Sequence, residues 1–230
     1  MMLATLRDEV LEANLEVVRR GLVLYTFGNA SGIDRSRGLV VIKPSGVPYS
    51  GMTAADLVIV DMDGQRVEGS ARPSSDLPTH LELYKGFSSI GGVVHTHSRA
   101  ATSWAQAGLE IPCLGTTHAD YFHGPVPLVP RLSEEEIEGG YERNTGLAIV
   151  RHFTGINPLA RPGALLHGHA PFTWGKNPTH AAEMAVILEE IAEMAWRAVV
   201  LNASAVPVSE CLLNKHYLRK HGPDAYYGQS

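Results

Sequence analysis

Two histidine pairs, each with one residue between its members, are the strongest chemical signal in the sequence. His95 and His97 end one apolar run, and His167 and His169 end another. Side chains two positions apart in a β-strand point to the same face, so each pair brings two imidazoles together. Imidazole is a common ligand of divalent metals, and two such pairs predict a metal site. The spacing leaves open whether His167 or His169 completes it.

Several turns carry residues suited to a phosphate group. The segments 27–32, 43–46 and 72–76 combine glycine or proline with serine and other polar residues, and Lys43 adds a cation. Free backbone N–H groups and hydroxyls at such turns bind small anions, but the same residues are also ordinary turn formers. Asp76 precedes an expected helix, where it would either cap the helix or bind a metal. No segment matches a nucleotide-binding loop.

Two further segments are rich in polar residues. Segment 116–124 has no amphipathic period, so it reads as a functional loop in which Asp120 is either a general acid or base or a solvated carboxylate. Segment 215–222 is a basic helix end that complements the helix dipole, and two tyrosines, Tyr226 and Tyr227, follow it.

Ser133 and Glu136 form a capping box, so the acidic run beside them is interpreted as a helix start.

Length and composition suit one globular domain over residues 1–230. The chain is 44% hydrophobic with a formal net charge of −5, so nucleic acid and anionic membranes are unexpected partners. Its acidic N-terminal segment excludes a signal peptide, and no apolar run is long enough to span a membrane. The two cysteines form no C-x-x-C pair, which fits a reducing compartment. We expect a cytoplasmic protein.

Hydrophobic periodicity predicts an α/β chain. Helical spacing indicates an N-terminal helix ended by Gly21 and a long helix from Thr179 to about Val200. Short apolar runs predict strands at 39–42, 57–62 and 147–150, besides the strands that precede the two histidine pairs.

In order and spacing, these motifs resemble those of the class II aldolase family, and within it the sugar-phosphate 4-epimerases. The resemblance runs from about Leu6 to Gln229. It implies a layered fold with a central, mostly antiparallel sheet flanked by helices, and a homotetrameric ring with each site at a subunit interface.

The resemblance also implies roles for individual residues. A zinc ion would be held by Asp76, His95, His97 and His169. Substrate would lie against Gly28, Asn29, Lys43, Ser45, Gly46, Ser74, Ser75 and His216. Asp120 and Tyr227 match the family's acid and base, and would serve a neighbouring subunit's zinc.

The implied reaction interconverts L-ribulose 5-phosphate and D-xylulose 5-phosphate by retro-aldol cleavage and re-formation of the C3–C4 bond. Zinc would act as a Lewis acid that stabilises the enediolate, although manganese or cobalt would suit the same ligands. The family's aldolases carry Glu where this chain has Asp76, which favours an epimerase. The alternatives are an aldolase that releases aldehyde products, or a non-catalytic adducin-like domain. An arabinose or another pentose pathway would fit equally.

Overall fold

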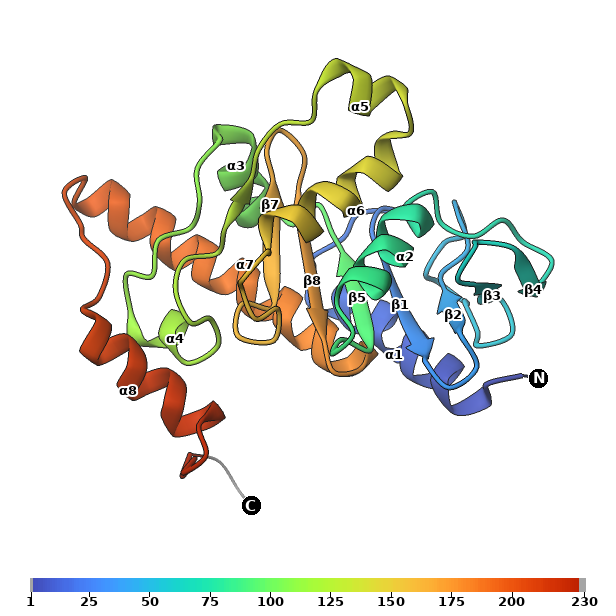
Figure 1. The fold of residues 1–230 in the computed structure, drawn as a ribbon, viewed down its shortest axis with the longest axis horizontal. Helices are drawn as coiled ribbons and strands as arrows, with labels where there is room; N and C mark the ends of the chain where they lie inside the picture. Colours follow the sequence, from blue (N-terminus) through green and yellow to red (C-terminus); the bar gives the residue numbers. More distant parts are fainter. Residues whose placement is uncertain (1, 228–230) are drawn as a thin grey trace.

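A single eight-stranded sheet organises the computed structural model, which describes residues 2–227 (Figure 1). The strands are β1 (Asn29–Asp34), β2 (Leu39–Ile42), β3 (Val58–Asp61), β4 (Arg66–Glu68), β5 (Gly92–His95), β6 (Leu128–Val129), β7 (Gly163–Leu166) and β8 (Pro171–Gly175). Their order in the sheet is β4-β3-β2-β1-β5-β8-β7-β6. All pairings between these strands are antiparallel except β6 with β7. The expected layered, mostly antiparallel fold is confirmed.

Helices cover both faces of this sheet. They are α1 (Ala4–Arg19), α2 (Leu77–Gly86), α3 (Arg99–Ala107), α4 (Thr116–Ala119), α5 (Glu134–Glu138), α6 (Tyr141–His152), α7 (Pro178–Leu201) and α8 (Glu210–His221). The α2 and α6 helices pack together on one face, while α1 and α7 pack together on the other (Figure 1). The α8 helix extends from the body and contacts α4. Among the described residues, no helix is long and apolar enough to cross a membrane.

The core follows the alternation of side chains along each strand. Val40 and Val93 are buried against α2 and α6, whereas Val41 and Val94, one position further along, are buried with α1 or α7. Successive residues of a strand point to opposite faces, so a strand covered on both sides can be apolar at every position. This double burial explains the uninterrupted apolar runs of β2 and β3.

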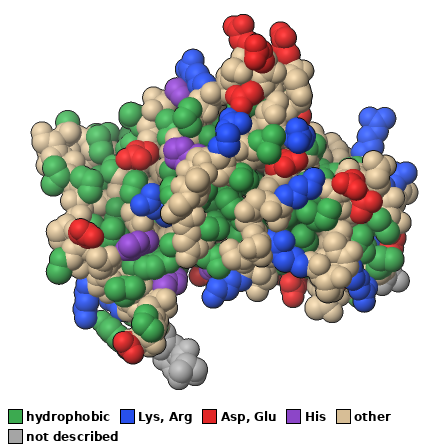
Figure 2. Space-filling model, in the orientation of Figure 1, with side chains coloured by type: hydrophobic (Ala, Val, Ile, Leu, Met, Phe, Trp, Pro, Cys, Tyr) green, Lys and Arg blue, Asp and Glu red, His purple; other side chains and the backbone are tan. Residues whose placement is uncertain are grey.

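The predicted helices and the capping box agree well with the structure. The α1 and α7 helices lie where helical spacing placed them. Ser133 accepts from the backbone N–H of Glu136, and the Glu136 side chain accepts from the backbone N–H of Ser133. The acidic first turn of α5 that follows projects from the upper edge of the molecule (Figure 2).

One predicted strand is wrong. Residues 147–150 belong to α6, where Thr145, Gly146, Ala148 and Ile149 are buried. That burial pattern marks one face of a helix, and a four-residue apolar run alone cannot distinguish a strand from a helix. The β8 strand was not predicted, and segment 116–124 contains the short helix α4.

Candidate active site

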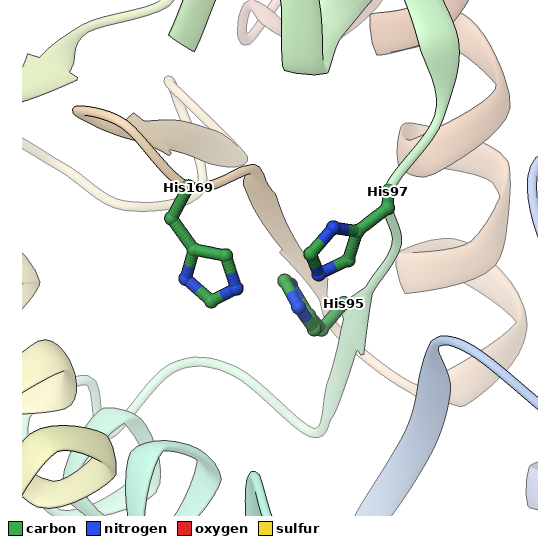
Figure 3. A group of neighbouring side chains, drawn as sticks. All are labelled: His95, His97 and His169. Carbon is green, nitrogen blue, oxygen red and sulfur yellow. The ribbon is translucent and has the colours of Figure 1, made fainter. Parts of the chain in front are cut away.

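Three histidines converge at one edge of the sheet. His95 is the last residue of β5, His97 follows two residues later, and His169 lies in the turn between β7 and β8. Their ligand atoms all lie within 4.8 Å of one another, and each pair of ring centroids is 4.9 Å apart (Figure 3). This spacing fits three imidazoles around one divalent ion. His167 lies elsewhere, with its Nε2 accepting from Arg131 Nε at 3.2 Å.

Neighbouring groups orient two of these rings. The Nδ1–H of His95 donates to the carbonyl of Pro171 at 2.9 Å, and the Phe172 ring stacks on His95 at 4.1 Å. The hydroxyl of Tyr141 lies 3.1 Å from Nδ1 of His169. Such partners fix the ring and leave the second nitrogen available for a metal. Burial lowers the pKa of His95 and brings that of His169 to about 4, which keeps both rings neutral as metal ligation requires.

Asp76 occupies the N-cap position of α2 but makes no side-chain capping bond. Its carboxylate accepts from Nδ2 of Asn29 at 2.6 Å and faces the same cleft as the three histidines. Although burial alone would raise the pKa of Asp76, the nearby His95 and His80 and the Asn29 amide hold it below its ordinary value. The carboxylate is therefore ionised beside the imidazoles, but outside their tight group.

A cleft of about 460 Å³ joins the histidines to the polar turns. The candidate metal and substrate residues that line it are Gly28, Asn29, Lys43, Ser45, Gly46, Ser74, Ser75, Asp76, His95, His97 and His169. A cleft of this volume accommodates a small phosphorylated sugar.

Backbone hydrogen bonds hold two of the polar turns together. The amide of Ser74 donates to the carbonyl of Lys43 at 3.0 Å, and the amide of Ser45 donates to the carbonyl of Arg72 at 2.9 Å. The Lys43 side chain is buried, with Nζ 4.6 Å from the centroid of the Tyr49 ring. Burial lowers the pKa of Lys43. A desolvated ammonium in a cleft that is also lined by Ser45, Ser74 and Ser75 is a suitable partner for a phosphate.

Asp120, His216 and Tyr227 form a separate group where α4 meets α8. Both Asp120 oxygens accept from Arg219, at 3.1 and 2.8 Å, and His216 Nδ1 lies 3.0 Å from Oδ1. The Arg219 guanidinium lies over the Tyr227 ring, 4.6 Å from its centroid. Although burial would raise the pKa of Asp120, the bonds from Arg219 and His216 lower it. None of these residues lines the cleft described above.

Two polar neighbours of the candidate residues were missed from the sequence. Arg219 was interpreted only as part of a basic helix end, yet its spacing of three residues from His216 places both on one side of α8. That spacing, together with the carboxylate of Asp120 in a polar segment, was the only sequence signal that Arg219 belongs to the same group. Tyr141 lies 28 residues before His169, and no sequence pattern connects them.

Comparison with known proteins identifies the class to which this fold belongs. A solved L-fuculose 1-phosphate aldolase has a TM-score of 0.80 at 22% identity, covering 96% of this chain and 98% of that one. The L-fuculose-1-phosphate aldolase of Thermus thermophilus has a TM-score of 0.70 at 22% identity, covering 89% and 100%. The family model for the class II aldolase and adducin N-terminal domain matches residues 8–196. The chain belongs to the class II aldolase family.

Within that family, the chain is much more similar to one group of enzymes. It is 56% identical over 224 residues to the L-ribulose-5-phosphate 4-epimerase UlaF of Salmonella paratyphi C (strain RKS4594), covering 97% of this chain and 98% of the relative. The protein of the same name from Salmonella typhi has the same identity and coverage. These relatives match almost the full chain, including the α8 region beyond the family model.

Proposed function

We propose that the protein is an L-ribulose-5-phosphate 4-epimerase. The observation that carries the proposal is the single cleft that combines three convergent imidazoles and Asp76 with Lys43 and the serine-containing turns. One end suits a divalent metal and the other a phosphate, as a small sugar phosphate requires. The 56% identity with enzymes named for this activity supports the same substrate.

The metal proposed for this site is zinc, held by His95, His97, His169 and Asp76. Nitrogen and carboxylate oxygen are ligands that zinc accepts readily, although manganese and cobalt share this preference. When bound, zinc supplies Lewis acidity at the substrate's carbonyl and neighbouring hydroxyl oxygens. Asn29 holds the Asp76 carboxylate at the edge of the histidine group.

The chain's own residues position the substrate and prevent release of the aldehyde. Lys43, Ser45 and Ser74 bind the phosphate, with the backbone of Gly28 and Gly46 and the side chains of Asn29 and Ser75 around it. C3–C4 cleavage gives the enediolate of dihydroxyacetone and glycolaldehyde phosphate. Because the phosphate stays bound, the aldehyde is retained while its carbonyl turns its other face to the enediolate. Re-formation of the bond then inverts C4.

Proton transfer at the C4 oxygen is proposed for Asp120 and Tyr227, with His216 beside them. Within one chain these residues gather at α4 and α8 and do not line the metal cleft. The proposal therefore includes a homotetramer in which this group completes the cleft of a neighbouring subunit. Exposed apolar side chains near the end of α7, namely Trp196, Val200 and Leu201, are consistent with burial between subunits.

We further propose that residues 1–230 act as one catalytic domain in the cytoplasm. Cys113 and Cys211 are both free thiols, and Cys211 is exposed, which suits a reducing compartment.

Product analysis tests the proposed function. Purified protein loaded with zinc is incubated with L-ribulose 5-phosphate, and D-xylulose 5-phosphate should accumulate without free glycolaldehyde phosphate or dihydroxyacetone. His97→Asn should lose both bound zinc and turnover because it removes a ligand. Release of free aldehyde would instead identify an aldolase, and turnover by the His97→Asn variant would refute the site.

A further inference from the structure

A buried chain of hydrogen bonds lies directly behind the candidate metal site. Ser31 of β1 stands between two residues of α2: its Oγ is 2.7 Å from Nδ1 of His80 and 2.7 Å from the hydroxyl of Tyr84. All three side chains are buried. The His80 ring also meets the edge of Phe172, the residue whose ring stacks on His95. The chain therefore begins in the core and ends beside the metal ligands.

The direction of the protons in this chain follows from its burial. The Tyr84 hydroxyl must donate its proton, and Ser31 Oγ is its bonded neighbour, so Tyr84 donates to Ser31. Ser31 then donates to Nδ1 of His80. A ring nitrogen that accepts a hydrogen bond carries no proton, so the His80 ring is neutral and its single proton lies on Nε2. The opposite direction would leave the buried tyrosine proton without an acceptor.

The His80 Nε2–H is thus a fixed donor that has no partner among the described protein groups, and Oδ1 of Asn29 is a buried acceptor that likewise has none. Asn29 and Ser31 are two residues apart on β1, so both side chains leave the strand on the face that contacts His80. Asp76 and His80 are four residues apart at the start of α2 and lie on one side of it. Asn29 already donates to the Asp76 carboxylate.

We propose that His80 is a positioning residue, whose Nε2–H donates through one water to the Asn29–Asp76 pair and holds the Asp76 carboxylate in place for the metal. This inference rests on the proposed metal site. Hydrogen bonds to the groups that orient metal ligands commonly alter metal affinity by about 10- to 100-fold. The buried hydrogen bonds from Tyr84 and Ser31 keep the His80 ring in one tautomer, whereas a solvent-exposed histidine would exchange between two.

The test is the zinc dissociation constant, measured by competition with a chelator of known affinity. His80→Asn keeps an amide near the position of Nδ1 but removes the donor at Nε2, so zinc should bind about tenfold more weakly or worse. His80→Gln places an amide N–H near Nε2 and should bind zinc as the parent does. His118→Asn is the matched control, because His118 is also a buried, neutral histidine but contacts Gly124 instead of the site. It should unfold at a lower temperature with unchanged zinc affinity.

Parental zinc affinity in His80→Asn would overturn the inference, as would equal losses in the Asn and Gln variants. Should His80→Asn fail to fold, Ser31→Ala decides, because it leaves His80 in place but removes the hydroxyl that selects its tautomer. Several-fold weaker zinc binding is expected there, and no change would overturn the proposal. If the parent itself bound no zinc, the proposed function would fail. If the parent bound zinc and both His80→Asn and His80→Gln bound it equally well, only the role of His80 would be refuted.

Discussion

Complementation between inactive variants tests the sharing of one active site by two subunits. His97→Asn removes a ligand in the cleft, and Asp120→Asn removes the carboxylate between α4 and α8. Within one chain Asp120 does not line the cleft, so the proposed site needs two subunits. Each variant alone should be nearly inactive, but if the proposed tetramer forms, mixed tetramers should contain sites built from the intact half of each.

The expected recovery follows from the geometry. In a ring with one site per interface, an active site needs an Asp120→Asn subunit to supply the cleft and a His97→Asn neighbour to supply Asp120. With equal, random mixing each condition is met half of the time, so about a quarter of the parental activity should return. A site contained in a single chain would give no recovery, since every chain carries one lesion.

The assay is co-expression of the two variants with different affinity tags, sequential purification of mixed tetramers, and measurement of D-xylulose 5-phosphate formation. Two pairings serve as controls. Mixing His95→Asn with His97→Asn, or Asp120→Asn with Tyr227→Phe, places both lesions in the same half of the site and should restore nothing. Mixed tetramers of His97→Asn and Asp120→Asn that stay inactive while binding zinc would refute the shared site.

Other predictions concern phosphate binding, pH and helix capping. Lys43→Met should raise KM for the sugar phosphate about 10- to 100-fold, since it removes a charged hydrogen-bond donor worth about 1.5–3 kcal/mol; an unchanged KM would exclude Lys43 from the phosphate site. Burial lowers the pKa of His118 from 6.5 to about 4, so its folded state favours the neutral ring. The stability this provides is complete above pH 6.5 and is lost as the pH falls to about 4, by about 3 kcal/mol. Urea unfolding of His118→Gln should show a correspondingly flatter pH dependence, and identical pH slopes would contradict this account. Glu189 accepts from the backbone amides of Ala100 and Ala101 in the first turn of α3, so Glu189→Ala should lower the free energy of unfolding by about 1–3 kcal/mol, whereas Glu190→Ala should change it little.

Local sequence patterns predicted the long elements reliably. The α1 and α7 helices bury one side along their length, and this periodicity is visible without a structure. The capping box of Ser133 and Glu136 is equally local, since its partners lie three residues apart. The run 147–150 was mispredicted because packing of α6 against α2, rather than its own composition, decides its conformation.

Part of the candidate site could likewise be predicted from local spacing, and part depended on the fold. The residue types and the close spacing of His95 and His97 indicated a metal site from the sequence, because both come from one strand end. The choice of His169 over His167 depends on the turn between β7 and β8, which directs the former to the group and the latter to Arg131. The resemblance to a known family anticipated this choice, but the spacing alone did not.

The sequence by itself determined which chemical groups are available. These are imidazoles in pairs, serine-containing turns with a lysine, and Asp120 in a segment without helical periodicity. Only the tertiary structure decided which of these groups meet. The pairing of β5 with β8 brings His95 close to His169, and the bonds between the turns at Lys43 and Ser74 form one cleft wall. The tertiary structure also keeps Asp120 away from that cleft, where Asp120 accepts hydrogen bonds from Arg219 instead. The reason is physical, because contacts between residues far apart in the chain depend on how whole elements pack, which no local pattern records.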